Sequence, residues 1–139
     1  GTEMTVTAAN ANEQLVLDFF ETLSAGDLDA LRGYFHDQSV WHPKVRGIAG
    51  AGEHVGMDII DLFLAPVRGL FEAGDPKVTV TNLFSDGDTV GVESYSTGKT
   101  MDGKLYENDY AWVFRISNGK IDRLHEYMDS QHTAQLFGM

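Results

Sequence analysis

The second half of the chain constrains the fold most strongly, because its apolar and polar residues alternate over four long segments. These segments are residues 77–84, 89–97, 105–116 and 120–128. Alternation with a period of two is typical of β-strands that bury one face. Two of the connections, residues 85–88 (Ser-Asp-Gly-Asp) and 117–119 (Ser-Asn-Gly), contain dipeptides that favour tight hairpin turns. The sequence therefore predicts an antiparallel meander after residue 75.

Helical spacing dominates the first half of the chain. Residues 12–24 carry Leu15, Phe19 and Leu23 at intervals of four, and Gly26 can end that helix in a left-handed conformation. The other predicted elements are a helix over 28–35, a short strand over 39–42, a helix over 55–73 that Pro66 should kink or split, and a closing helix over 130–137. Helices followed by a meander indicate an α+β fold with the helices on one face of a curved sheet.

Length and composition narrow the possible roles of the chain. At 139 residues it has the size of one domain, which we place at residues 12–139, after a flexible segment over residues 1–11. Gly1 in place of a starting Met indicates a scar from tag removal. The chain has no cysteine, so disulfides and thiolate chemistry are not available to it.

The charge distribution argues against large anionic partners. The net charge is −11, and the Lys and Arg residues are scattered singly along the sequence. Phosphate backbones require a basic face, so we expect no nucleic acid partner. No apolar run approaches the roughly 18 residues that span a membrane, so we expect no membrane association and a cytoplasmic location.

Two stretches, one at each end of the chain, have a recognisable order of residues. They comprise residues 20–31 (FETLSAGDLDAL), 34–35 (YF) and 40–43 (VWHP), and residues 106–121 (YENDYAWVFRISNGKI) and 126–129 (EYMD). In this order they resemble the SnoaL-like and ketosteroid-isomerase-like proteins of the nuclear transport factor 2-like superfamily. The resemblance implies a cone-shaped barrel in which N-terminal helices pack on a strongly curved, mostly antiparallel sheet and enclose an apolar pocket. It implies no single activity, because this fold carries isomerases, cyclases, dehydratases, hydrolases and proteins without catalysis.

If the pocket lies between the concave face of the sheet and the helices, as in that superfamily, strand parity decides which side chains enter it. Asn108, Tyr110 and Trp112 share the larger and more apolar face of their segment. Each carries a hydrogen-bond donor for a carbonyl or a developing oxyanion. On the last strand Glu126 and Met128 share a face. We therefore predict these five side chains in a substrate-binding pocket.

Glu126 is the first candidate for acid/base chemistry. A carboxylate that faces an apolar cavity has its pKa raised towards neutral pH by desolvation. Its position also looks like that of the catalytic aspartate in limonene epoxide hydrolase-type members of the superfamily. The alternative is a structural role, in which a neighbouring Tyr or Asn hydrogen-bonds to Glu126 or the side chain turns outward at the strand end.

His42 is the second candidate. With one residue deleted in the preceding turn, residues 41–43 resemble the segment that bears the general-base aspartate of the steroid isomerases, and His42 takes its position. Histidine titrates near neutral pH and can accept a proton. If the deletion is placed elsewhere, the parity reverses and Trp41 enters the pocket instead. Phe19 stands where those isomerases carry a phenol, so it could line the pocket without donating.

Other members of the superfamily use groups that are missing here. Ser94 and Ser96 stand where the epoxide hydrolases carry an arginine and a second aspartate. The glycine-rich residues 47–52 lack the pattern of a phosphate-binding loop and are better explained as a lid over the pocket mouth. Asp129 has the parity to point away from the pocket, where it can cap the final helix.

These observations together predict a cofactor-independent enzyme without a metal that acts on a small apolar molecule through Glu126 or His42. Isomerisation, cyclisation, dehydration and hydrolysis all remain open. The alternative is a non-catalytic small-molecule-binding or dimeric interaction protein of the same fold. The resemblance also implies a homodimer that pairs through the convex sheet face. Apolar residues assigned to that face are Val78, Val80, Val90, Val92, Val113 and Tyr127.

Overall fold

The fold was obtained as a computed structural model that describes residues 6–139; of the predicted flexible segment, residues 1–5 lie outside this range. The helices are α1 (Ala11–Ala25), α2 (Leu28–Leu31), the 3-10 turn η1 (Arg32–Tyr34), the π-helical η2 (Ile59–Leu64), α3 (Ala65–Arg68) and α4 (Ser130–Phe137). The strands are β1 (Phe35–Pro43), β2 (His54–Val55), β3 (Lys77–Asp86), β4 (Thr89–Lys99), β5 (Leu105–Ser117) and β6 (Lys120–Met128). None of the helices in the described range is long and apolar enough to cross a membrane.

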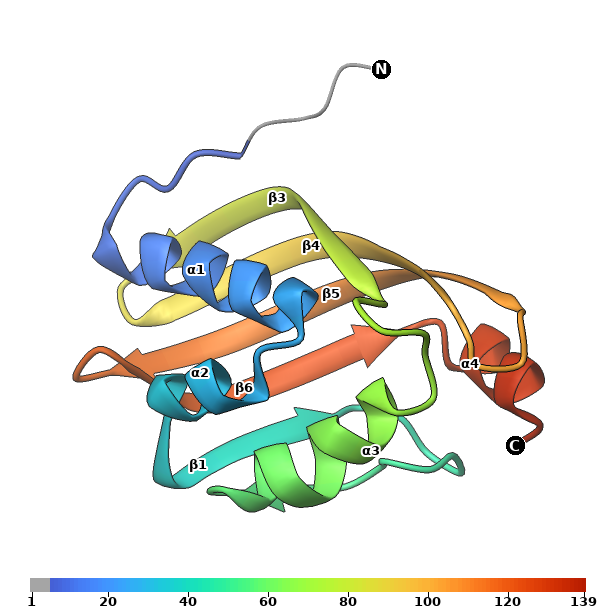
Figure 1. Cartoon of the computed structure of the whole chain (residues 1–139). Coiled ribbons are helices and arrows are strands. Elements are labelled where there is room, and N and C mark those ends of the chain that lie inside the picture. The colour runs from blue at the N-terminus through green and yellow to red at the C-terminus, as the bar shows by residue number, and fades with distance from the viewer. Residues whose placement is uncertain (1–5) are drawn as a thin grey trace.

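The strands form one open sheet with the order β2-β1-β6-β5-β4-β3. The β3-β4-β5-β6 meander is antiparallel, as is the β1–β2 pair, whereas β1 runs parallel to β6. The helices lie on one face of this curved sheet: α1 crosses β3 to β5, η2 and α3 cover β1, and α4 closes one end (Figure 1). The predicted α+β class and the antiparallel meander are confirmed.

Helix α1 supplies the main contact between the two layers. Its ends follow local signals, because the Asn10 side chain accepts a hydrogen bond from the backbone N–H of Glu13 and Gly26 ends the helix in the left-handed conformation. Phe19 and Phe20 are both buried and make edge-to-face contacts with Phe114 of β5. These rings anchor the helix to the concave face of the sheet.

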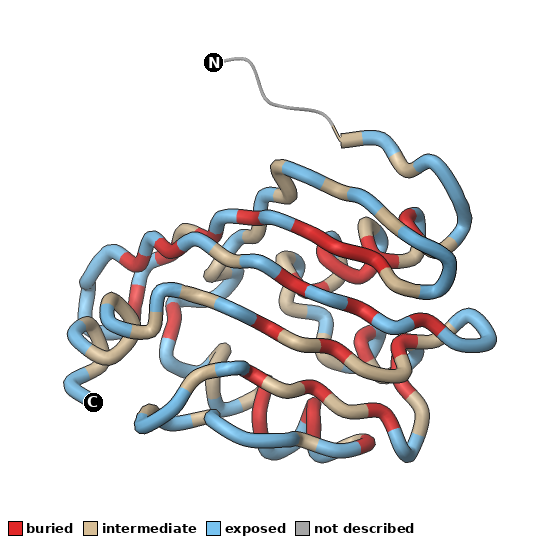
Figure 2. Tube along the Cα trace, turned by 180° about the vertical axis from the view of Figure 1, so that it is seen from behind, coloured by how far each residue is buried: buried red, intermediate tan, exposed pale blue. Residues whose placement is uncertain are grey.

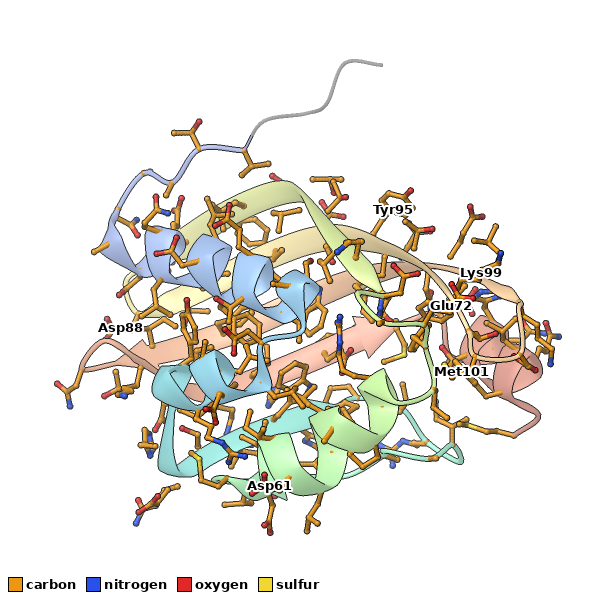
Figure 3. The ribbon with its side chains drawn as sticks, viewed as in Figure 1. Asp61, Glu72, Asp88, Tyr95, Lys99 and Met101 are labelled. Carbon is orange, nitrogen blue, oxygen red and sulfur yellow. The ribbon has the colours of Figure 1, made fainter. Side chains whose placement is uncertain are left out.

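The predicted third helix is shorter than expected, and it runs without a gap from Ile59 to Arg68 as π-helical η2 followed by α3. Residues 54–55 form the short strand β2, and the helical segment starts at Ile59. Pro66 lacks the N–H that would bond one turn back, and η2 immediately before it is π-helical. An ion pair joins η2 to the 3-10 turn η1: Arg32 Nη2 lies 2.6 Å from Oδ1 of Asp61, which projects outward from η2 (Figure 3).

Two other boundaries differ from the prediction. The second helix stops at Leu31 and turns through η1, so the strand predicted over 39–42 begins at Phe35. Phe35 pairs with Ile121 and Trp41 with Leu124, which shows that pairing with β6 extends β1 at its N-terminal end. Backbone hydrogen bonds to a strand that is distant in sequence override the local helical spacing of these residues.

The prediction of an apolar patch on the convex face was partly wrong. Val90 and Val92 are fully buried, because they lie opposite Phe114 and Trp112 on the concave face that α1 covers. Val78 and Val80 are half-buried against the same core. Buried and exposed residues alternate along the strands seen from behind (Figure 2). The apolar side chains that remain exposed on these strands include Phe84, Tyr95, Val113 and Tyr127.

Candidate functional site

An apolar cavity has a volume of about 410 Å³, which is in the size range of small-molecule sites. It lies between the end of the concave sheet face, the η2–α3 segment, the loop after β1 and helix α4. Most of its lining is apolar, and the polar side chains in it are His54, Tyr106, Tyr110, Glu126 and Thr133. A smaller space of about 70 Å³ continues inward past Glu126 and Tyr110 and is lined by Trp41, Arg68, Ser96 and Trp112 among others.

Glu126 stands at the junction of these two spaces. Its side chain comes from β6, where it is flanked by Pro43 of β1 and Trp112 of β5. Only 7% of the residue is exposed, and Trp41 Nε1 donates a 2.9 Å hydrogen bond to Glu126 Oε1. Burial raises the pKa of the Glu126 carboxyl to about 7, although the Trp41 hydrogen bond opposes this rise. Glu126 can therefore accept or donate a proton near neutral pH.

A hydrogen-bonded chain of side chains ends at Tyr110. Asn108 Nδ2 donates a 2.9 Å hydrogen bond to the Tyr106 hydroxyl, which is also hydrogen-bonded to the Tyr110 hydroxyl. Because Tyr106 accepts from Asn108, it can donate its own proton to Tyr110 and leave the Tyr110 proton for a ligand. Burial raises the pKa of both tyrosines, so both hydroxyls stay protonated at neutral pH. Tyr110 is then a neutral donor in the wall of the cavity.

The structure brings together only part of the predicted pocket. Tyr110, Glu126 and Met128 line the main cavity, and Trp41 and Trp112 line the inner space. Asn108 does not line either space, because its amide holds α4 in place through Asp129 O and Thr133 Oγ1 at 3.1 Å. The indole of Trp112 is also already engaged, since its Nε1 donates to Ser94 Oγ at 2.8 Å.

Two predicted residues lie elsewhere. His42 is on the opposite face of β1 from the cavity, so of the two registers considered for this segment the one that turns Trp41 inward holds. Phe19 is fully buried rather than exposed to the cavity. Its ring packs against five other aromatic rings, those of Phe20, Tyr34, Phe35, Trp41 and Phe114. Phe19 therefore supports Trp41 from behind and does not meet a ligand.

Three polar residues of the cavity were missed from the sequence. Tyr106 has the same parity as Asn108 and Tyr110, so strand alternation alone could have identified it. His54 stacks on Phe63 with ring centroids 4.2 Å apart, and its Nε2 lies 2.7 Å from Gly50 O. Thr133 enters from α4. No periodic pattern marks His54 or Thr133, because the chain must fold back before either reaches the cavity.

The loop after β1 has the position that was predicted for a lid. Ile48, Ala49 and Gly50 line the cavity, and the backbone N–H of Lys44 donates a 2.7 Å hydrogen bond to Glu126 O at the base of the loop. The Asp129 cap is confirmed, since its side chain accepts from the N–H groups of Gln131 and His132. Within residues 6–139 no group of three or more His, Asp or Glu side chains could hold a metal ion.

Comparisons with known structures agree with this fold. TerC, crystallised with polyporic acid, is 21% identical over 94% of this chain and 100% of its own, with a TM-score of 0.80. An NTF2-like protein from Burkholderia thailandensis is 22% identical over 92% and 98%, with a TM-score of 0.80. A protein with a ketosteroid isomerase-like fold from Catenulispora acidiphila, in complex with trimethylamine, is 18% identical over 82% and 84%, with a TM-score of 0.70.

The sequence itself carries the family assignment. No curated protein matches the chain. Residues 16–124, which include most of α1, all of β1 to β5 and about half of β6, match the SnoaL-like domain. This match spans well over half of the sequence and includes both Trp41 and Tyr110. The chain therefore belongs to the SnoaL-like domain family.

Proposed function

We propose that the protein is a cofactor-independent enzyme that moves a proton on a small, largely apolar carbonyl compound, with Glu126 as the base. The observation that carries this proposal is the carboxyl of Glu126, with a pKa of about 7, in an apolar cavity that the half-buried donor Tyr110 also lines. Desolvation keeps this carboxyl near half-protonation at neutral pH, where a general base or acid works best.

The proposed step needs only groups of this chain. The Glu126 carboxylate removes a proton from the carbon next to the substrate carbonyl, and the C–H electron pair forms the enolate. The Tyr110 hydroxyl donates a hydrogen bond to the developing oxyanion, and the Asn108–Tyr106 chain holds that hydroxyl in its donor orientation. The protonated Glu126 then returns its proton to another position. This cycle suits isomerisation. Enolate formation alone is also the first step of an aldol-type cyclisation, in which the enolate carbon attacks a second carbonyl of the substrate and Glu126 returns its proton to the new alkoxide.

A binding protein without turnover is the second candidate. Two of the three predicted donors, Asn108 and Trp112, are already satisfied by other protein groups, which leaves Tyr110 as the donor for a ligand. TerC, which shares the fold, was crystallised with polyporic acid, so a ligand in this cavity is consistent with either candidate.

Replacing Tyr110 with Phe tests whether the Tyr110 hydroxyl hydrogen-bonds to the ligand or the ligand is held by apolar contacts alone. We expect small ketones and lactones to raise the melting temperature of the wild type, and the Tyr110→Phe variant to bind the same compound about tenfold more weakly, because one buried hydrogen bond is lost. Isothermal titration measures the difference. Tyr95→Phe, which alters an exposed tyrosine of β4, is the matched control. Equal affinity in both variants would remove Tyr110 from the proposed site.

We also infer that two copies pair through the convex sheet face. Phe84, Val113 and Tyr127 are 57%, 41% and 41% exposed there on β3, β5 and β6. We expect a dimer in sedimentation at micromolar concentration, and a shift to monomer in Val113→Glu, because a charge would be buried against a second copy. Val55→Glu changes a valine of similar exposure, 47%, on the edge strand β2 and should leave the dimer intact. A monomeric wild type would exclude this pairing.

A further inference from the structure

A second hollow lies outside the apolar cavity, beyond the loop that follows β1. It has a volume of about 430 Å³ and is lined by His42, Lys44, Val45, Arg46, Ala51 and Gly52. We call it the basic groove. Val45 lines both the basic groove and the apolar cavity, so the loop forms the wall between them. No residue of the proposed proton-transfer machinery lines the basic groove.

The side chains around the basic groove concentrate positive charge. Arg123 of β6 lies beside it and pairs with Glu53, with 2.8 Å between Nη1 and Oε2. Within residues 6–139 neither Lys44 nor Arg46 makes an ion pair. Three cations therefore meet one carboxylate, in a chain whose net charge is −11. The protein as a whole is negatively charged, so this local excess of positive charge is an exception, and it favours the binding of anions at the groove.

Two histidines add a charge that depends on pH. His42 of β1 and His125 of β6 are register neighbours in the parallel pair, and their rings meet edge to face with centroids 5.8 Å apart. Burial lowers the pKa of both rings, and Lys44 and Arg123 add to this effect, whereas Glu53 opposes it. His54 further lowers the pKa of His42, and His42 further lowers the pKa of His125. Two neutral imidazoles beside free cations are poorly suited to bind a metal ion, but they can gain protons when an anion enters.

We propose that the basic groove binds a small oxyanion, such as phosphate or the phosphate group of an organic ligand, between Lys44, Arg46 and the His42 ring. The two cations supply charged donors, and the backbone at Gly52 is open, since a Cβ there would meet no atom within 4 Å. The bound anion stabilises protonated His42 and His125. Its affinity therefore rises as the pH falls through the pKa values of these rings, and it is lowest above them.

Titration with inorganic phosphate in about 0.1 M salt, where the Debye length is about 10 Å, tests the proposal directly, with NMR detection of the backbone amides of residues 44–52 and of the two imidazoles. We expect saturable shifts at these positions and about tenfold weaker binding in Lys44→Ala. With sulfate, which is a dianion at both pH values, binding should be stronger at pH 5.5 than at pH 8, because only the histidines change their charge. Lys44→Arg should retain binding. Lys99→Ala removes the same charge from the end of β4 (Figure 3) and should bind within about twofold of wild type, because screening by salt leaves distant charges little effect.

A parallel titration with phenyl phosphate distinguishes the source of the anion. Equal affinity for both probes supports a free oxyanion, and tighter binding of phenyl phosphate supports the phosphate group of an organic ligand. The absence of saturation, or equal losses in Lys44→Ala and Lys99→Ala, would overturn the site. The apolar cavity and Glu126 take no part in either titration, so failure here leaves the proposed enzyme function untouched.

Discussion

At pH 8 the Glu126→Gln variant should be more stable than the wild type, by about 3 kcal/mol in the free energy of unfolding. The cause is the cost of keeping a carboxylate in an apolar cavity, which raises the pKa of Glu126 from 4.5 to about 7 in the folded state. Glutamine carries no charge, and its side-chain oxygen can still accept the hydrogen bond from Trp41 Nε1. The substitution therefore removes the penalty and keeps the local contact.

The sign of the pH dependence follows from the raised pKa. Because the folded protein holds the Glu126 proton more tightly than the unfolded chain, the wild type is most stable below pH 4.5 with respect to this group and loses stability as the pH rises to about 7. Between the two proteins, the difference in unfolding free energy should shrink to about 1 kcal/mol at pH 5. Urea denaturation at pH 5 and pH 8 measures it.

An exposed glutamate gives the control for this experiment. Glu72 projects into solvent between α3 and β3 (Figure 3), and Glu72→Gln should change stability by less than about 0.5 kcal/mol at either pH. If Glu126→Gln is less stable than the wild type at pH 8, the carboxylate is stabilised by its surroundings and the desolvated-base interpretation fails. A stabilising substitution at a functional residue would be the usual sign of a site that sacrifices stability for chemistry.

The sequence predicts the layers of the fold well because each depends on a local pattern. The alternation in residues 105–116 places Tyr110 and Trp112 on the concave face, and the four-residue spacing in α1 turns Phe19 towards the core. Both patterns need no knowledge of a partner. The carboxyl of Glu126 was found in the same way, from its parity on β6 and the apolar side chains that share its face.

Long-range pairing decides what the sequence could not. Whether Trp41 or His42 faces the cavity depends on how β1 is aligned beside β6, a parallel strand about 80 residues later, and no local pattern fixes that register. Val90 and Val92 were assigned to the wrong face for a related reason. Which sheet face they occupy depends on how β4 pairs with β5, and this pairing places Val92 opposite Trp112 on the concave face. The Asn108 amide likewise donates to Asp129 O and Thr133 Oγ1 only because α4 packs beside β5.

Turnover should depend on Glu126 far more than ligand binding does. With a ketone or lactone that the wild type both binds and turns over, Glu126→Gln should lower kcat by about 10² to 10⁴, the usual contribution of a positioned general base. The amide has the size of the carboxyl and cannot take a proton, so affinity should change little. In the wild type, kcat/KM should rise with pH to a plateau, with an apparent pKa of about 7, because only the carboxylate is active as a base.

The Tyr110→Phe variant tests whether the rise of kcat/KM near pH 7 belongs to Glu126. This variant should lose rate because the oxyanion has no donor, but its pH profile should keep the rise near pH 7, since the carboxyl is unchanged. Residual turnover in Glu126→Gln should lack the rise altogether. If Glu126→Gln retains more than about a tenth of the wild-type rate, or keeps the same rise, another group moves the proton. Binding of the same compound without any turnover in the wild type would instead favour the non-catalytic candidate, with Glu126 and Tyr110 serving recognition alone.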